Sequence, residues 1–280
     1  MTTVIARAIL LLALLSLTSF AAPGARTDAT AQASHPTAPA QTEEKIGSAS
    51  HIAPLRPGFR FPYGQTFHYE GEWRFWTAGV ATLRMEQSGA QNHVSATVDS
   101  TGAVSLLYRV ADSFNSYSDA KTLCSNKLIK HSEEGSHRRD TSITYDYGRG
   151  KAVLEERSLK DNQQKRTEND IPGCVTDVVS GMLYVASLPL QVGSTYTFPL
   201  NDGGKTVTVQ AHVEGKEDIK TPAGTFHTVR VGPEGDSGTL LRNKGRIWIW
   251  YTDDDKHLPI QIRAKVFYGT LTVYLTSISK

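Results

Sequence analysis

Alternation of apolar and polar residues is the dominant pattern from residue 58 to the end of the chain. It is clearest at 66–75, where Phe67, Tyr69, Trp73 and Phe75 stand between charged or polar neighbours. A period of two puts one set of side chains on a buried face and the other in water, which predicts a β-strand. Similar segments predict further strands at 80–87, 93–99, 113–117, 123–132, 142–147, 152–157, 195–200, 206–214, 226–231, 246–252, 259–268 and 270–278.

Short turn signals separate neighbouring strands. Gly148-Arg149-Gly150 and Asn201-Asp202-Gly203-Gly204 are examples. Such spacing indicates antiparallel hairpins rather than alternating strands and helices. A dozen or so strands in one domain must close, form two layers or curve. We therefore expect an all-β fold with one or two short helices, built as a curved antiparallel meander sheet or partial barrel.

One segment, 176–186, has the spacing of a helix. Thr176 or Asp177 is suited to cap its start, and Pro189 follows its end. The apolar residues that recur at helical spacing are Val175, Val178, Val179, Met182 and Leu183.

Two other segments depart from strand alternation. Residues 104–110 predict a second, shorter helix, whereas 159–170 is almost wholly polar and predicts an exposed loop that is open to disorder.

The first residues have the layout of a secretory signal. A single positive charge at Arg7 precedes an apolar run at 8–20, and Ser19 and Ala21 have the spacing that signal peptidase favours. We predict a signal peptide at 1–21 with cleavage before Ala22. Residues 22–57 are rich in Ala, Thr and Pro and predict a disordered tether, which leaves 58–280 as a single β domain.

Charge and hydropathy limit the kinds of partner and the cellular location that the sequence allows. The net charge is +2 with neutral histidines, and the lysines and arginines are scattered, so a nucleic-acid partner is not expected. The signal run is shorter than the roughly 20 residues that a spanning helix needs, and no later apolar run is longer. We expect an exported protein, periplasmic or extracellular, that is soluble after cleavage and has no membrane span.

The chain has two cysteines, Cys124 and Cys174. In an exported protein a disulfide between them is the simplest interpretation. Two buried free thiols are the alternative, since cysteine is often a small core residue. Metal binding is a weaker interpretation, because no neighbouring ligand pair accompanies either cysteine.

Patterns that carry catalysis or bind metals are not found in the sequence. It has no Gly-x-Ser-x-Gly elbow, and none of its nine histidines forms a His-x-His or His-Glu-x-x-His pair. Asp253-Asp254-Asp255 lacks the spacing, glycine and distal glutamate of a calcium loop and predicts a charged turn. We therefore assign no catalytic, metal-binding or cofactor-binding residue and expect no cofactor.

A groove for an apolar or amphipathic molecule remains as a candidate site. One helix is too small to cover the apolar face of so many strands, so the sheet must fold on itself or leave a groove. Alternatively, the same residues fill a packed core. The candidate groove residues are Tyr69, Trp73, Val179, Met182, Trp248 and Trp250.

Several elements in order resemble a known family. The most specific is Thr221-Pro222-Ala223-Gly224-Thr225-Phe226, followed by Ile247-Trp248-Ile249-Trp250 and a turn into Leu258-Pro259-Ile260. Upstream, Gly64 to Tyr69, Gly79 to Leu83 and the segment from Asp177 to Tyr184 agree in order. The chain resembles the bacterial exported family catalogued as domain-of-unknown-function 3108, which implies an envelope-associated β domain without an assigned activity. A looser similarity, in the Asp-x-x-x-Leu-Pro hairpin, is to periplasmic lipoprotein carriers, whose half-barrels hold acyl chains.

Three hypotheses about function follow. The first is noncatalytic binding of a lipid or glycolipid in a concave β-sheet. The second is an assembly factor that binds another envelope protein through a sheet edge, and the third is a hydrolase whose site has no recognised motif. A large apolar cavity would favour the first, a long exposed edge the second, and a cluster of perturbed acids and histidines the third.

Overall fold

The computed structural model describes residues 52–73, 76–235, 245–266 and 269–280. They form one antiparallel sheet of 14 strands with two short helices, α2 (Gly102–Leu107) and α3 (Val178–Ala186). The expected all-β fold is confirmed. The strands are β1 (Thr66–Trp73), β2 (Trp76–Ser88), β3 (Gln91–Ser100), β4 (Val110–Asp119), β5 (Ser125–Glu134), β6 (His137–Asp146), β7 (Lys151–Ser158), β8 (Gln164–Asp170), β9 (Thr195–Asn201), β10 (Thr206–Thr221), β11 (Gly224–Gly235), β12 (Arg246–Thr252), β13 (Pro259–Val266) and β14 (Gly269–Ser279).

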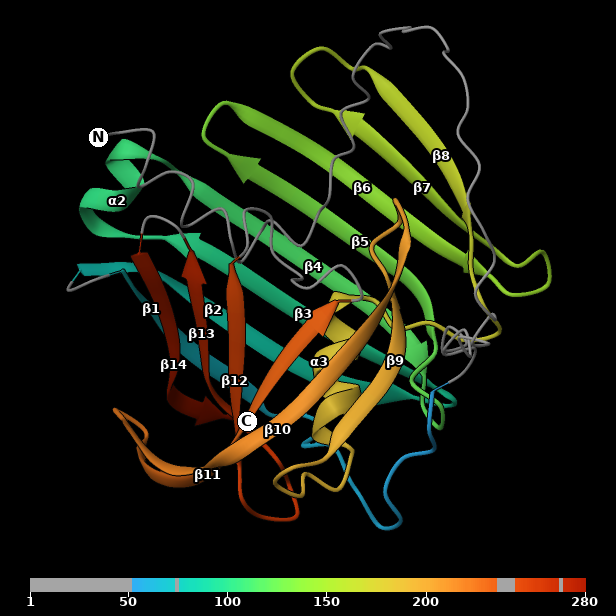
Figure 1. Cartoon of the computed structure of the whole chain (residues 1–280). Coiled ribbons are helices and arrows are strands. Elements are labelled where there is room, and N and C mark those ends of the chain that lie inside the picture. The colour runs from blue at the N-terminus through green and yellow to red at the C-terminus, as the bar shows by residue number, and fades with distance from the viewer. Residues whose placement is uncertain (1–51, 74–75, 236–244, 267–268) are drawn as a thin grey trace, which may run out of the picture.

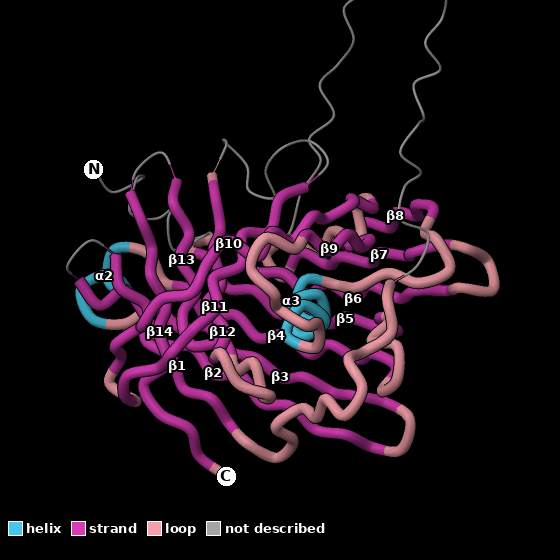
Figure 2. Tube along the Cα trace, turned by 60° about the horizontal axis from the view of Figure 1, so that its bottom comes forward, coloured by secondary structure: helices cyan, strands magenta, loops and turns pink. Residues whose placement is uncertain are grey.

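The strand order explains how one chain builds so wide a sheet. Strands β1 to β8 follow one another outward from the middle of the sheet. The chain then passes through α3 to the opposite edge, and β9 to β14 return to the middle, where β14 pairs with β1. Figure 1 shows the resulting curved sheet with α3 inside its curve, and Figure 2 shows the same helix enclosed by strands. The predicted antiparallel meander is therefore confirmed.

Strand alternation places the core on the inner side of the curve. In β1, Phe67, Tyr69 and Trp73 are buried while His68 and Glu70 are only partly buried. Strand β4 has the same period, with Phe114 buried between partly buried neighbours. Because every second side chain points inward, many strands contribute to one continuous core that also includes the apolar side chains of α3.

Helix α3 begins at Val178 and not at Thr176. Asp177 is the N-cap, and its carboxylate accepts hydrogen bonds from the backbone of Val179 and Ser180. Thr176 instead forms a short parallel bridge with Leu200 of β9. The helix ends at Ala186, with Ser187 as its C-cap, before Pro189. The shorter helix, predicted at 104–110, lies at 102–107 instead, because Val110 already belongs to β4.

The polar segment at 159–170 differs from the expected loop. Residues 164–170 form β8, which pairs with β7 over seven residues from Lys151 to Arg157. Its side chains are mostly exposed, so there is no apolar alternation to reveal the strand. Backbone hydrogen bonding to β7 holds it at the sheet edge, and exposed ion pairs such as Lys151 to Asp170, at 2.6 Å, accompany this pairing.

The ordered domain begins before residue 58. Ile52 is buried in the core, the Ala53 amide donates to the Tyr184 hydroxyl at 2.9 Å, and the Arg56 amide donates to the Ser187 carbonyl at 3.1 Å. Residues 52–57, expected in the tether, therefore pack against the C-terminal part of α3. The predicted signal peptide and residues 22–51 of the predicted tether lie outside the described residues.

The turn between β9 and β10 contacts the far edge of the sheet. The Asn169 side chain in β8 donates to the Gly203 carbonyl at 2.8 Å, and the Tyr145 hydroxyl in β6 donates to the Asn201 carbonyl at 2.9 Å. Gly203 has φ +87°, and a Cβ there would lie 2.7 Å from side-chain atoms of Ile143. This position therefore requires glycine, and the turn brings the two ends of the open sheet together.

Candidate ligand-binding site

A first apolar cavity lies between α3 and the inner face of the sheet. Its volume is about 140 Å³, and Val179 and Met182 form part of its helical wall. The Tyr69 ring contributes to the opposite wall, while its hydroxyl donates to the Pro259 carbonyl at 3.0 Å. Burial raises the pKa of Tyr69 well above its usual range, so the hydroxyl remains a neutral donor. The remaining lining residues are Ala81, Thr82, Leu83, Ala96, Thr97, Val98, Phe114, Val178, Ile262 and Val273.

A second cavity of about 130 Å³ lies toward the strands β9 to β14. Gly181 and Val185 form part of its helical wall. The two cavities share Val178, Met182, Ile262 and Val273. They are therefore neighbouring parts of one hollow that α3 faces. The other lining residues of the second cavity are Phe198, Leu200, Val209, Val231, Pro233, Ile247, Ile249, Ala264 and Leu271.

A buried hydrogen-bond network fixes the start of α3. One oxygen of the Asp177 carboxylate accepts from the hydroxyls of Ser116 and Ser125, each at 2.7 Å. The other accepts from the amides of Val179 at 2.8 Å and Ser180 at 3.0 Å. Asp177 is 0% exposed, so these bonds are shielded from water. They tie the helix to β4 and β5 and so set the position of the cavity wall.

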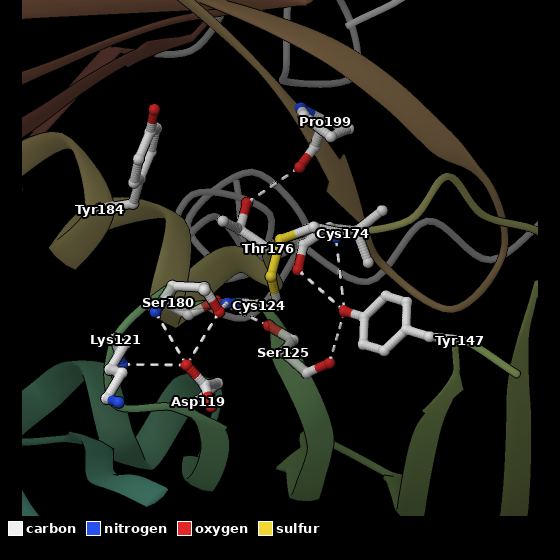
Figure 3. The surroundings of a disulfide bond; sticks show 12 residues. Asp119, Lys121, Cys124, Ser125, Tyr147, Cys174, Thr176, Ser180, Tyr184 and Pro199 are labelled. Atoms are coloured by element: carbon white, nitrogen blue, oxygen red, sulfur yellow. Dashed lines mark hydrogen bonds between the residues drawn. A yellow bond between two sulfur atoms is a disulfide. The ribbon is translucent and has the colours of Figure 1, made fainter. Parts of the chain in front are cut away.

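The predicted disulfide between Cys124 and Cys174 is present beside this network (Figure 3). Their Cα atoms are 5.2 Å apart. The bridge joins the residue before Ser125 to the segment that leads into Asp177. Tyr147 adds to the same junction, because its hydroxyl donates to the Ser125 carbonyl at 2.7 Å. Burial raises the pKa of Tyr147 to about 12, which keeps that donor protonated.

Three of the six predicted groove residues meet at the first cavity: Tyr69, Val179 and Met182. Trp73 also points inward from β1 and is buried in the core, but it is not in the wall of either of these two cavities.

Trp248 and Trp250 differ from the prediction. In β12 it is Ile247 and Ile249 that line the second cavity, so the two tryptophans point to the opposite face of the sheet. The Trp248 indole donates to Glu214 at 3.2 Å, and the Trp250 indole donates to Glu217 at 2.9 Å. These tryptophans belong to a charged network on the outer side of the sheet and not to the groove.

A buried ion pair next to the first cavity was not predicted from the sequence. Asp112 and Lys130 lie on the inner face of β4 and β5, with 3.6 Å between the ammonium and a carboxylate oxygen. The ammonium lies 3.6 Å from Glu134 and 5.1 Å from the centre of the Phe114 ring, which lines the cavity. Polar residues at inward positions of β4 and β5, such as Asp112, Ser116 and Lys130, were the available signal.

The environment of Asp112 changes its titration. Burial raises the pKa of this carboxyl to about 6, and the nearby Lys130 opposes the shift. The folded protein therefore retains this proton at pH values where the unfolded chain has lost it. The contribution of this group to stability falls as the pH rises from about 4 to about 6. Charged Asp112 is thus costly for the fold, as buried ion pairs often are.

Among the described residues, neither helix is long and apolar enough to cross a membrane. Within the same residues, no group of three or more histidine, cysteine, aspartate or glutamate side chains is arranged to hold a metal ion.

The family is defined by sequence comparison. The model of a family described as a protein of unknown function, DUF3108, matches residues 68–276. This range covers most of the chain, and the chain belongs to that family. The predicted family is confirmed. A search of curated proteins finds no match to this chain.

One solved structure has a similar fold. A β-barrel-like protein of the domain of unknown function DUF1849 from Brucella abortus aligns with a TM-score of 0.52 at 9% identity, covering 82% of this chain and 99% of that one. This likeness concerns the fold alone. A Bacteroides fragilis protein described as exported, with a YmcC-like fold, aligns at TM-score 0.31, 12% identity and coverages of 79% and 99%. A Parabacteroides distasonis protein described as a lipoprotein aligns at TM-score 0.30 and 11% identity, covering 79% of this chain and 98% of that one. TM-scores this low carry no structural argument.

Proposed function

We propose that this protein is an exported, noncatalytic binding protein that holds an apolar or amphipathic ligand, such as a lipid or glycolipid, in its concave sheet. The observation that carries the proposal is the apolar hollow between α3 and the sheet, which the protein's own side chains leave unfilled. A ligand there would gain about 25 cal/mol for each Å² of apolar surface that it buries, without any catalytic group.

The ion pair of Asp112 and Lys130 supports an amphipathic ligand. Phe114 lines the cavity and also faces the Lys130 ammonium, so an apolar wall and charged groups meet at one place. A molecule with an apolar chain would leave its polar end near these charges. A purely apolar core would not need a buried pair that costs stability.

Export is the second part of the proposal. It rests on the signal-like sequence at 1–21 and on the disulfide, since disulfides form and persist mainly outside the reducing cytoplasm.

The edge strand β8 bears on the assembly-factor hypothesis. Lys165, Arg166, Glu168 and Asp170 make this edge strongly charged, which is a common way to prevent pairing with another strand. The apolar hollow therefore favours ligand binding over partner binding through this edge. The hydrolase hypothesis stays a prediction.

Binding of a fluorescent fatty-acyl probe tests the proposed function. The purified protein should bind the probe saturably at micromolar concentrations. Val179→Asp should weaken binding at least about tenfold, because it puts a charge into the apolar wall. Val192→Asp is the matched control, since Val192 is 52% exposed and lines neither cavity, and it should bind as the unmodified protein does. Absence of saturable binding, or equal affinity in both variants, would refute the proposal.

A further inference from the structure

The size of each cavity limits what it can hold alone. A dry apolar cavity of about 150 Å³ in an engineered protein accommodates one benzene molecule. The two cavities here have volumes of about 140 and 130 Å³, so each has room for a segment of roughly six carbons. A lipid-like chain is longer than that and would need both.

The boundary between the cavities is formed by few side chains. Val178 and Met182 of α3 face Ile262 of β13 and Val273 of β14, and all four contact both cavities. Of these residues only Met182 is unbranched, with a flexible thioether chain that adapts its shape readily. Its backbone is held in place, because the Tyr251 hydroxyl donates to the Met182 carbonyl at 2.9 Å. Rotation of this side chain can therefore open the boundary without moving the helix.

We infer that the ligand is an amphipath with a straight alkyl chain of roughly ten or more carbons, which passes from one cavity to the other beside α3, and that Met182 is the residue that controls this passage. The inference rests on the proposed function and adds the chain length that the site selects. A compact ring system would occupy a single cavity and would gain nothing from the second.

A series of alkyl maltosides tests the inference, because the head group stays constant while the chain grows. Binding of hexyl, octyl, decyl and dodecyl maltoside is measured by calorimetry below their micelle-forming concentrations. Affinity should rise at each step through decyl, by up to about fourfold for each added methylene. A plateau at hexyl or octyl would overturn the inference and leave the proposed function standing. Absence of binding by every member of the series would overturn both.

Two substitutions at Met182 should change the series in opposite directions. Met182→Ala widens the boundary and should raise the affinity for dodecyl maltoside at least about threefold, with little effect on hexyl maltoside. Met182→Trp narrows the boundary, so the affinity should stop rising with chain length beyond hexyl maltoside. Val192→Ala, at an exposed site outside both cavities, is the control and should retain the unmodified series. Thermal unfolding establishes that each variant is folded. If affinity depends on chain length in the same way in folded Met182→Ala, folded Met182→Trp and the unmodified protein, Met182 does not control the passage.

Discussion

Asp177→Ala is expected to lower the free energy of unfolding by about 3 to 5 kcal/mol, the largest effect of any single substitution considered for this chain. The carboxylate is fully buried and accepts hydrogen bonds from the hydroxyls of Ser116 and Ser125 and from two amides of α3. Alanine would leave these buried donors without their acceptor. Urea denaturation monitored by tryptophan fluorescence measures the change.

Asp177→Asn separates the cap from the rest of the network. Its remaining carbonyl oxygen can accept from Val179 and Ser180, but its amide nitrogen cannot accept from the two serines. This variant should lose about 1 to 3 kcal/mol, less than the alanine variant. Equal stability of the alanine variant and the unmodified protein would show that the network does not hold α3 in place.

Replacement of both Cys124 and Cys174 by serine should lower the free energy of unfolding by about 2 to 4 kcal/mol. The bridge closes a loop between positions 50 residues apart, which restricts the unfolded chain, and the chain-entropy estimate for such a loop is about 4 kcal/mol. Chemical denaturation of the double variant beside the oxidised protein measures the loss.

Reduction provides a control for the cysteine replacements. The unmodified protein treated with reductant should lose a similar amount of stability, whereas the double variant should not respond. Because the bridge and the Asp177 network hold the same junction, loss of both should not be additive. A double variant as stable as the oxidised protein would show that the disulfide contributes nothing to the fold.

Strands with one solvent-exposed and one buried face could be predicted well from the sequence. Alternation in β1 identified its buried aromatic side chains, and β12 was predicted with its observed bounds. Strand β8 could not be predicted in the same way, because its side chains are polar on both faces. Its position depends on backbone pairing with β7, which is visible only once the two segments are adjacent.

The candidate site was predictable only in part. Helical spacing identified Val179 and Met182, which line the first cavity. Alternation in β12 shows that tryptophans and isoleucines occupy different faces, but it does not say which face is inside. The isoleucines are inside, and Glu214 and Glu217 on β10 accept hydrogen bonds from the indole groups on the outside. This pairing joins strands distant in sequence, so a local pattern could not reveal it.

Native mass spectrometry of the protein purified from the cells that make it naturally tests the central claim, that the hollow beside α3 holds an apolar or amphipathic ligand. The account predicts a noncovalent adduct with the mass of a molecule that carries an alkyl chain, released by organic extraction and retained less by Val179→Asp than by Val192→Asp. The mass of the polypeptide alone, from a preparation that also fails to retain added dodecyl maltoside, would contradict the account.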